Sequence, residues 1–174
     1  MTSLVIAEHN NSTLLGATYN TIAAAVELNA DVHLLVAGND CMAVAEQAAK
    51  AEGVNKVIVV QDSSLTHLTA ESITSVVMSI ASNYEHLLAG STTFGKNFIP
   101  RVAALLDVAQ ISDITAVESS DTFIRPIYAG NAIATVKSND SVKVLTVRST
   151  GFDALALDGG NAEIEEHSCS ITDS

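Results

Sequence analysis

Short apolar runs alternate with longer stretches in which apolar residues recur every three or four positions through residues 4–106. An unbroken apolar run is typical of a strand buried on both faces, and the recurrence is typical of an amphipathic helix. The expected strands are residues 4–7, 32–37, 57–60 and 86–89, and a helical stretch follows each of them. The alternation predicts a three-layer α/β fold, with a mostly parallel sheet of about five strands covered by helices on both faces.

Most of the predicted helices also carry local signals at their ends. Polar residues that can cap a helix N-terminus stand before each of the first three: Asn11, Ser12 or Thr13, then Asn39 or Asp40, and then Thr69. The second helix, over residues 41–52, should stop at Gly53. Apolar stripes on one face are expected at Leu15, Tyr19, Ile22 and Val26 in the first helix and at Ile73, Val76, Val77 and Ile80 in the third.

The pattern changes after Ile114, where β-rich segments follow one another without a helical stretch between them. Gly130-Asn131 suits a two-residue hairpin turn, because Gly takes a positive φ readily, and residues 138–141 suit a second turn. The strands are expected at residues 122–128, 132–137 and 142–148. The complete expected fold is a Rossmann-like, adenine-nucleotide α-hydrolase-like α/β domain with a C-terminal antiparallel β-meander.

The last part of the chain has a different composition. From Asp158 onward it is rich in Gly, Ser and acidic residues, and Ile164 and Ile171 are its only large apolar side chains. Such a segment buries too little apolar surface to offset its ordering entropy. We expect a domain over residues 1–157 and an acidic linker or tail over 158–174 that is disordered or extended, and mobile.

Charge and composition limit the classes of partner. The chain of 174 residues carries a net charge of −12, which argues against nucleic acid and anionic membrane surfaces. No apolar run is long enough to cross a membrane, and no basic leader or transit segment precedes the first strand. Cys41 and Cys169 lack CxxC spacing, which favours a reducing compartment. We expect a cytoplasmic, bacterial protein that is not membrane-embedded.

Residues 86–117 read as strand, Gly-rich loop, helix and strand, an arrangement that presents backbone N–H groups to an anion. Residues 90–97 match the phosphate-binding pattern GxxxxGK, but Asn97 stands where a Ser or Thr would ligate Mg²⁺. Pro100 is expected in the first turn of a helix that includes residues 98–106. We therefore expect no Mg²⁺-nucleotide binding and no ATP hydrolysis at this loop.

Other reactive side chains lack the neighbours that chemistry requires. Asp113 suits a turn better than acid catalysis, and Cys41, near a helix start that would favour a thiolate, suits a small buried position. The five histidines show no metal-ligand spacing, and the hydroxyls of residues 91–93 have no GxSxG context. The sequence predicts no catalytic residue and no metal site.

Several long motifs resemble the electron transfer flavoprotein α subunit. They are VIAEH (5–9), VAG (36–38), FGKNFIPRVAALLDVAQISDITAV (94–117), TFIRPIYAGNAIATVK (122–137) and VKVLTVRSTGFDA (142–154). They follow the order of that family from about residue 3 to about residue 157. The resemblance identifies the chain as a member of this family, corresponding to the N-terminal domain of the α subunit.

The resemblance implies an electron carrier subunit rather than an enzyme. It implies a heterodimer with a β subunit, accepting electrons from acyl-CoA and related dehydrogenases and passing them to a quinone oxidoreductase. In that family FAD is held mainly by a C-terminal domain, whose Gly- and Ser-containing segments are absent from this sequence, and AMP is held by the β subunit. The chain is expected to be a scaffold that packs on the β subunit and holds no flavin alone.

Two sets of candidate residues follow, the first from the resemblance and the second from the residues themselves. The loop where the related β subunit binds its nucleotide corresponds here to vestigial candidates that follow the α-subunit pattern: Gly90, Ser91, Gly95, Lys96 and Arg101. Lys96 and Arg101 are alternatively a solvated cation and an ion-paired or packing Arg. A partner interface is expected at Arg125, Tyr128 and Asn131, with Arg125 and Tyr128 projecting to one face of a strand; the alternative for these two residues is half of an exposed sheet face.

Three functional hypotheses remain open on the sequence. The first is the electron transfer flavoprotein α-subunit domain, a binding and scaffold module. The second is a small nucleotide-binding domain, P-loop-like or stress-protein-like, that uses residues 90–96. The third is an interaction domain whose nucleotide-type fold is vestigial. Fold analogy cannot separate them, because function resides in the site.

Overall fold

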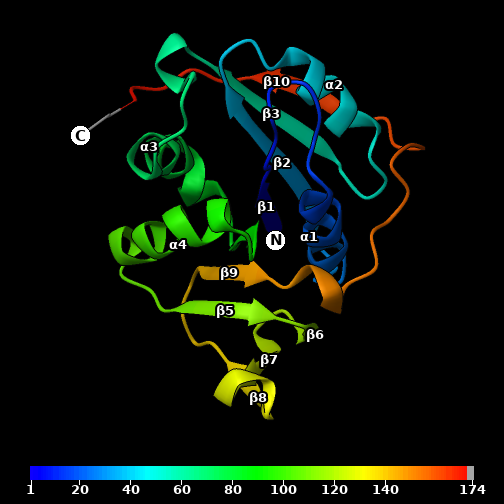
Figure 1. The fold of residues 1–174 in the computed structure, drawn as a ribbon, viewed down its shortest axis with the longest axis vertical. Helices are drawn as coiled ribbons and strands as arrows, with labels where there is room; N and C mark the ends of the chain where they lie inside the picture. The colour runs from blue at the N-terminus through cyan, green and yellow to red at the C-terminus, as the bar shows by residue number, and fades with distance from the viewer. Residues whose placement is uncertain (172–174) are drawn as a thin grey trace.

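The computed structural model describes residues 1–171 and shows a seven-stranded sheet with two helices on each face (Figure 1). All neighbouring strands of this sheet are parallel, in the order β10-β3-β2-β1-β4-β9-β5. The strands are β1 (Thr2–Ile6), β2 (Asp31–Gly38), β3 (Lys56–Gln61), β4 (His86–Gly90), β5 (Gln110–Ile114), β9 (Lys143–Val147) and β10 (Glu163–Glu166). The three-layer α/β prediction is confirmed, with two strands more than expected.

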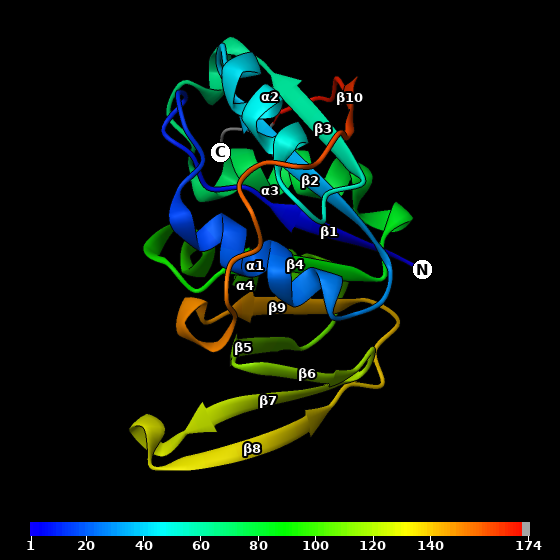
Figure 2. The same cartoon turned by 90° about the vertical axis from the view of Figure 1, so that its right-hand side faces the viewer.

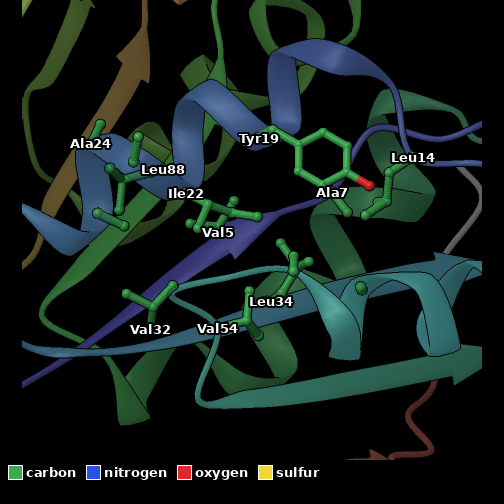
Figure 3. Close-up of a cluster of buried hydrophobic side chains, with 14 of the residues drawn as sticks. Val5, Ala7, Leu14, Tyr19, Ile22, Ala24, Val32, Leu34, Val54 and Leu88 are labelled. Atoms are coloured by element: carbon green, nitrogen blue, oxygen red, sulfur yellow. The ribbon is translucent and has the colours of Figure 1, made fainter. Parts of the chain in front are cut away.

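The helices are distributed evenly over the two faces of the sheet. Side chains of α1 (Gly16–Val26) and α2 (Met42–Lys50) pack with one set of strand residues, and those of α3 (Ala70–Ile80) and α4 (Thr93–Leu106) pack with the other. Figure 3 shows the first of these cores, in which Ile22 of α1 lies beside Val5 of β1 and Tyr19 lies near Ala7 and Leu14. The predicted stripe of α1 is right at its centre, but Leu15 and Val26 at its ends are 37% and 36% exposed.

The helix starts test the predicted caps. In α3, Thr69 and Ser72 form a reciprocal capping box, which confirms Thr69 as the N-cap. The cap predictions for α1 and α2 are wrong: Leu15 and Cys41 are the N-cap residues, and neither makes a side-chain cap. Asn10 accepts from the amide of Thr13, so this polar stretch forms a separate turn before α1 begins.

A separate antiparallel sheet of three strands lies beyond β5, at the end of the molecule opposite α2 (Figure 2). It consists of β6 (Ala116–Ser119), β7 (Thr122–Ile127) and β8 (Ala132–Lys137). The predicted meander is therefore only partly right, because β9 leaves this small sheet and inserts as a parallel strand between β4 and β5. The physical reason lies in burial: β8 alternates between half-buried and exposed positions, whereas four of the five β9 residues are buried.

The β7–β8 turn is longer than predicted. Ile127 pairs with Ala132, so four residues form the connection between the strands. The prediction of a two-residue turn at Gly130-Asn131 is therefore wrong. Gly130 does have a positive φ of 88°, as expected. Tyr128 and Ala129 also have positive φ values, of 51° and 54°. The tip is thus a short 3-10 segment, Tyr128–Gly130, rather than a tight hairpin turn.

The prediction of a free tail after Asp158 is wrong for the described residues. Residues 163–166 form β10 and pair in parallel with β3, and the Lys56 ammonium lies 3.0 Å from the Glu165 carboxylate. Ile164 packs against one core, and Cys169 and Ile171 pack against the other. Unpaired backbone groups at the edge of β3 supply hydrogen bonds that the composition of the tail does not reveal. The predicted tail also included residues 172–174, which lie outside the described residues.

Candidate functional site

The strand order creates a crevice between β1 and β4. From β1 the chain passes to β2 and β3 on one side, and then crosses to β4 on the other side. Ligands of open α/β sheets bind at such a switch point, outside the carboxyl ends of the strands. The residues that follow β1 (Thr2–Ile6) and β4 (His86–Gly90) therefore define the candidate site.

The connection after β4 is shorter than the predicted loop. Only Ser91 and Thr92 separate β4 from α4, so Gly95 lies in the first turn of the helix. The Gly95 amide donates to Thr92 Oγ1 at 3.3 Å, and a Cβ added at Gly95 would lie 2.0 Å from the Gly90 carbonyl oxygen. Gly95 is thus needed for a close backbone approach. Pro100 lies inside α4 rather than in its first turn, contrary to the prediction.

An acidic residue stands at the start of α4. The Thr92 hydroxyl, which caps this helix, donates to the Glu8 carboxylate at 2.8 Å. The backbone of Glu8 is held by α1, because its amide donates to Thr18 Oγ1 at 3.0 Å and its carbonyl accepts from the Leu15 amide at 2.9 Å. Glu8 was not among the predicted site residues, since its contact with Thr92 joins positions 84 residues apart.

A cavity of about 400 Å³ opens beside Glu8 and His9. The His9 Nε2 lies 2.7 Å from the Ala37 carbonyl oxygen, and Nδ1 accepts from the Asn11 amide at 3.0 Å. Burial lowers the pKa of His9, although the bond to Ala37 opposes this shift. Both ring nitrogens are therefore used to fix the loop after β1, and the neutral imidazole is favoured.

The five vestigial loop candidates are not assembled into one anion site. The Ser91 hydroxyl donates to the Asp113 carboxylate, and Gly90 is paired with β9. Arg101 pairs with Glu71 of α3 at 3.6 Å, whereas Lys96 is exposed. Since their polar groups turn to different neighbours, the geometry does not favour the nucleotide-binding alternative.

The remaining candidates have structural surroundings. Asp113 has a φ of 56°, and its amide donates to Thr146 Oγ1 at 3.0 Å, so it shapes the irregular end of β5. Cys41 is fully buried, and burial raises the pKa of its thiol. Within residues 1–171 no three His, Cys, Asp or Glu side chains gather as metal ligands. Among the helices described, none has the length and apolarity needed to cross a membrane.

The predicted interface residues do not share one face. The Arg125 Nε donates to the Ser112 carbonyl at 2.8 Å, so this side chain turns toward β5. Tyr128 is 78% exposed and lies in the tip with Asn131, not on the strand. Residues three apart cannot project to one face of a strand, because side chains alternate with a period of two. That part of the prediction is wrong.

The alternation instead defines an apolar outer face on the small sheet. Phe123 is fully buried on the inner side, so Ile124 and Pro126 project to the outer side. The register places Ile133 opposite Pro126, and Ile133 is 74% exposed. We call Ile124, Pro126 and Ile133 the outer face of the small sheet, and Tyr128 lies in the tip beside it. The period of two in residues 122–137 was the signal that could have identified it.

Fold and site together define a doubly wound, Rossmann-like α/β protein, whose crevice carries an acid and which bears an added antiparallel sheet. The family model described as "Electron transfer flavoprotein domain" matches residues 3–171. The chain belongs to this family, which confirms the resemblance predicted from its motifs.

Curated relatives agree with the family match. The electron transfer flavoprotein subunit alpha of Pseudomonas aeruginosa is 58% identical over 166 residues, which are 95% of this chain and 54% of that protein. The mitochondrial subunit alpha of Dictyostelium discoideum is 49% identical over 171 residues, 94% of this chain and 48% of that protein. The subunit alpha of Paracoccus denitrificans is 46% identical over 166 residues, 95% and 54% respectively. The chain thus spans about half the length of these relatives.

Proposed function

We propose that this chain is the N-terminal, scaffold half of an electron transfer flavoprotein α subunit. The main support for this proposal is the family match over residues 3–171, together with 58% identity to a protein named as that subunit. In this proposal the chain packs on a β subunit, in a heterodimer that carries electrons in the bacterial cytoplasm. Acyl-CoA and related dehydrogenases would supply the electrons, and a quinone oxidoreductase would receive them.

The residues of the crevice do not fit the diphosphate of FAD. The segment after β1 is Glu8-His9-Asn10-Asn11 and has none of the glycines of a dinucleotide-binding turn. The Glu8 carboxylate would also repel a diphosphate at the start of α4. We infer that this half serves as an electron carrier scaffold, that FAD is held by the other half of the subunit, and that AMP belongs to the β subunit. The isolated chain should be colourless.

We infer that the outer face and tip of the small sheet form part of the surface for the β subunit. Exposed aromatic and aliphatic side chains that lie close together are typical of the desolvated centre of a protein interface. Tyr128 and Ile133 are the most exposed large apolar residues of the described chain, at 78% and 74%. Asn131 lies beside them in the tip. Arg125 supports this surface from within, through its bond to Ser112.

Co-purification tests the proposal. The chain and the β subunit of the same organism are co-expressed, each with a different affinity tag. Ile133→Glu with Tyr128→Ala should lose most of the co-purifying β subunit, because a carboxylate is desolvated and an aromatic anchor is removed. Leu105→Glu on α4, where Leu105 is 60% exposed, is the matched control and should retain it. Wild-type chain that captures no β subunit would refute the partnership, and full retention by the double variant would refute the surface.

A further inference from the structure

The C-terminal segment of the described chain, residues 160–171, crosses the edge of β3 that faces away from β2, and we call this segment the strap. Before the edge, the Gly160 amide donates to the Lys50 carbonyl at the end of α2, at 2.8 Å. At the edge, β10 pairs in parallel with β3 (Figure 1). Beyond the edge, Ile171 packs against the core that includes α3 and α4. The strap thus runs from one face of the large sheet to the other.

The strap is held more by backbone hydrogen bonds than by packing. In the large sheet as described, β10 alone has no buried residue, and Ile164 is the half-buried one of its four residues. The ion pair of Glu165 with Lys56 is partly exposed and adds little. The neighbouring strand β3, in contrast, has four buried residues. A segment that buries so little apolar surface opens at a lower free-energy cost than the sheet that it covers.

The hydrogen bonds show which backbone groups the strap covers. The His167 amide donates to the Val59 carbonyl at 2.9 Å. Backbone groups of a strand point alternately to its two sides, so the N–H and C=O groups of Val57 and Val59 point toward β10. Those of Ile58 and Val60 point toward β2. Opening of the strap would leave the groups of Val57 and Val59 unpaired, and such an edge pairs readily with another extended chain.

We propose that the edge of β3 is a binding site for an extended peptide, which the strap covers within the chain and uncovers by local opening. The strap itself shows the chemistry of the partner. It is an acidic strand parallel to β3, with an apolar side chain at the position of Ile164 and a carboxylate at that of Glu165. Lys56, whose ammonium lies 3.0 Å from the Glu165 carboxylate, supplies the complementary charge. Main-chain pairing gives such a site its affinity, and the side-chain positions give it selectivity. This inference does not depend on the proposed function.

Hydrogen exchange in the wild-type chain tests the opening. The amides of the four consecutive residues from Val57 to Val60 are followed by NMR under native conditions. After correction for intrinsic exchange rates, Val57 and Val59 should exchange at least about tenfold faster than Ile58 and Val60, because opening of the strap alone releases them. Equal protection of all four amides would overturn the proposal, because the strap would then open only together with the sheet.

Peptide binding tests the uncovered edge. A peptide with the sequence of residues 160–168 is titrated into isotope-labelled wild type, His167→Pro and Glu166→Pro, and the Val57 and Val59 amide signals are followed by NMR. His167→Pro removes the amide that donates to Val59. Glu166→Pro removes an amide that points away from β3, so it is the matched control.

We expect His167→Pro to bind the peptide saturably and at least about tenfold more tightly than wild type or Glu166→Pro, because the apparent affinity rises with the fraction of chains whose strap is open. The same peptide with Glu165→Pro lacks an amide that faces β3 and should not shift these signals. Two results would overturn the proposal. One is a folded His167→Pro chain that binds the peptide no more tightly than wild type, and the other is a Glu165→Pro peptide that binds as tightly as the native sequence. If His167→Pro does not fold, the exchange measurement on wild type decides.

Discussion

Ile164→Ala distinguishes a folded edge strand from a free tail. Ile164 is half-buried in β10 and packs against the core formed with α1 and α2. Truncating a fully buried Ile to Ala costs about 2–5 kcal/mol, and a half-buried side chain should lose about half of that. We expect a decrease of about 1–2 kcal/mol in the free energy of unfolding. In a domain of this size, the melting temperature should fall by about 3–6 °C.

Urea denaturation followed by circular dichroism measures this difference. Leu157→Ala is the matched control, because Leu157 is 59% exposed in the same C-terminal segment and should change stability by less than about 0.5 kcal/mol. The Lys56–Glu165 pair is partly exposed, so its loss should weaken β10 by no more than about 1 kcal/mol. If Ile164→Ala unfolds at the same urea concentration as wild type, β10 adds no packing energy and the segment behaves as a tail.

Two further predictions concern the sheet and the start of α4. Burial lowers the pKa of His86 below its ordinary 6.5. As the pH falls, His86 is therefore protonated in the unfolded chain before it is protonated in the folded chain. The stability that depends on neutral His86 is present above pH 6.5 and is lost as the pH falls from there through the pKa of the folded state. His86→Gln should therefore reduce the decline in unfolding free energy between about pH 7.5 and 5. The control His67→Gln, at an exposed position, should show the same decline as wild type. Equal declines in wild type and His86→Gln would contradict this account. Gly95→Ala should lower the free energy of unfolding by about 2–4 kcal/mol, because the added Cβ would lie 2.0 Å from the Gly90 carbonyl oxygen. In the control Gly16→Ala the added Cβ meets no atom within 4 Å, so its stability should be unchanged or higher. If Gly95→Ala is as stable as wild type in urea denaturation, the backbone moves apart at this approach.

The sequence predicted those elements whose signals are local. Thr69 and the stripe from Ile73 to Ile80 lie within one helix, so capping and periodicity together defined α3. The start of α4 was placed too late, because its first turn contains Gly95, whose presence is explained by contact with Gly90 rather than by helix propensity. The position of β9 was missed for a similar reason, since residues 138–141 look like a turn and only the burial of Val144 and Leu145 shows that the strand belongs to the large sheet.

The candidate site was less predictable than the fold. The GxxxxGK pattern drew attention to the N-terminus of α4, but the acidic residue that contacts its cap, Glu8, is distant in the sequence. At the small sheet the residue types drew attention to the β7–β8 hairpin, whereas the pairing of Arg125 with Tyr128 on one face ignored strand alternation. Both errors have one physical origin: the neighbours of a side chain depend on strand register and crossover connections.

The distribution of charge and apolar surface explains how a nucleotide-type fold can serve as a scaffold. A doubly wound sheet always brings helix N-termini to its switch point, and their positive ends are stabilised by an anion. In this chain the hydroxyl of the N-cap residue Thr92 donates to the Glu8 carboxylate, so an acid of the chain itself lies at the start of α4. Among the described residues, the large apolar side chains with the highest exposed fractions, Tyr128 and Ile133, lie instead on the added small sheet and its tip. The scaffold proposal fits this division, in which the crevice carries an acid of the chain itself and the exposed apolar surface is one suited to another protein chain.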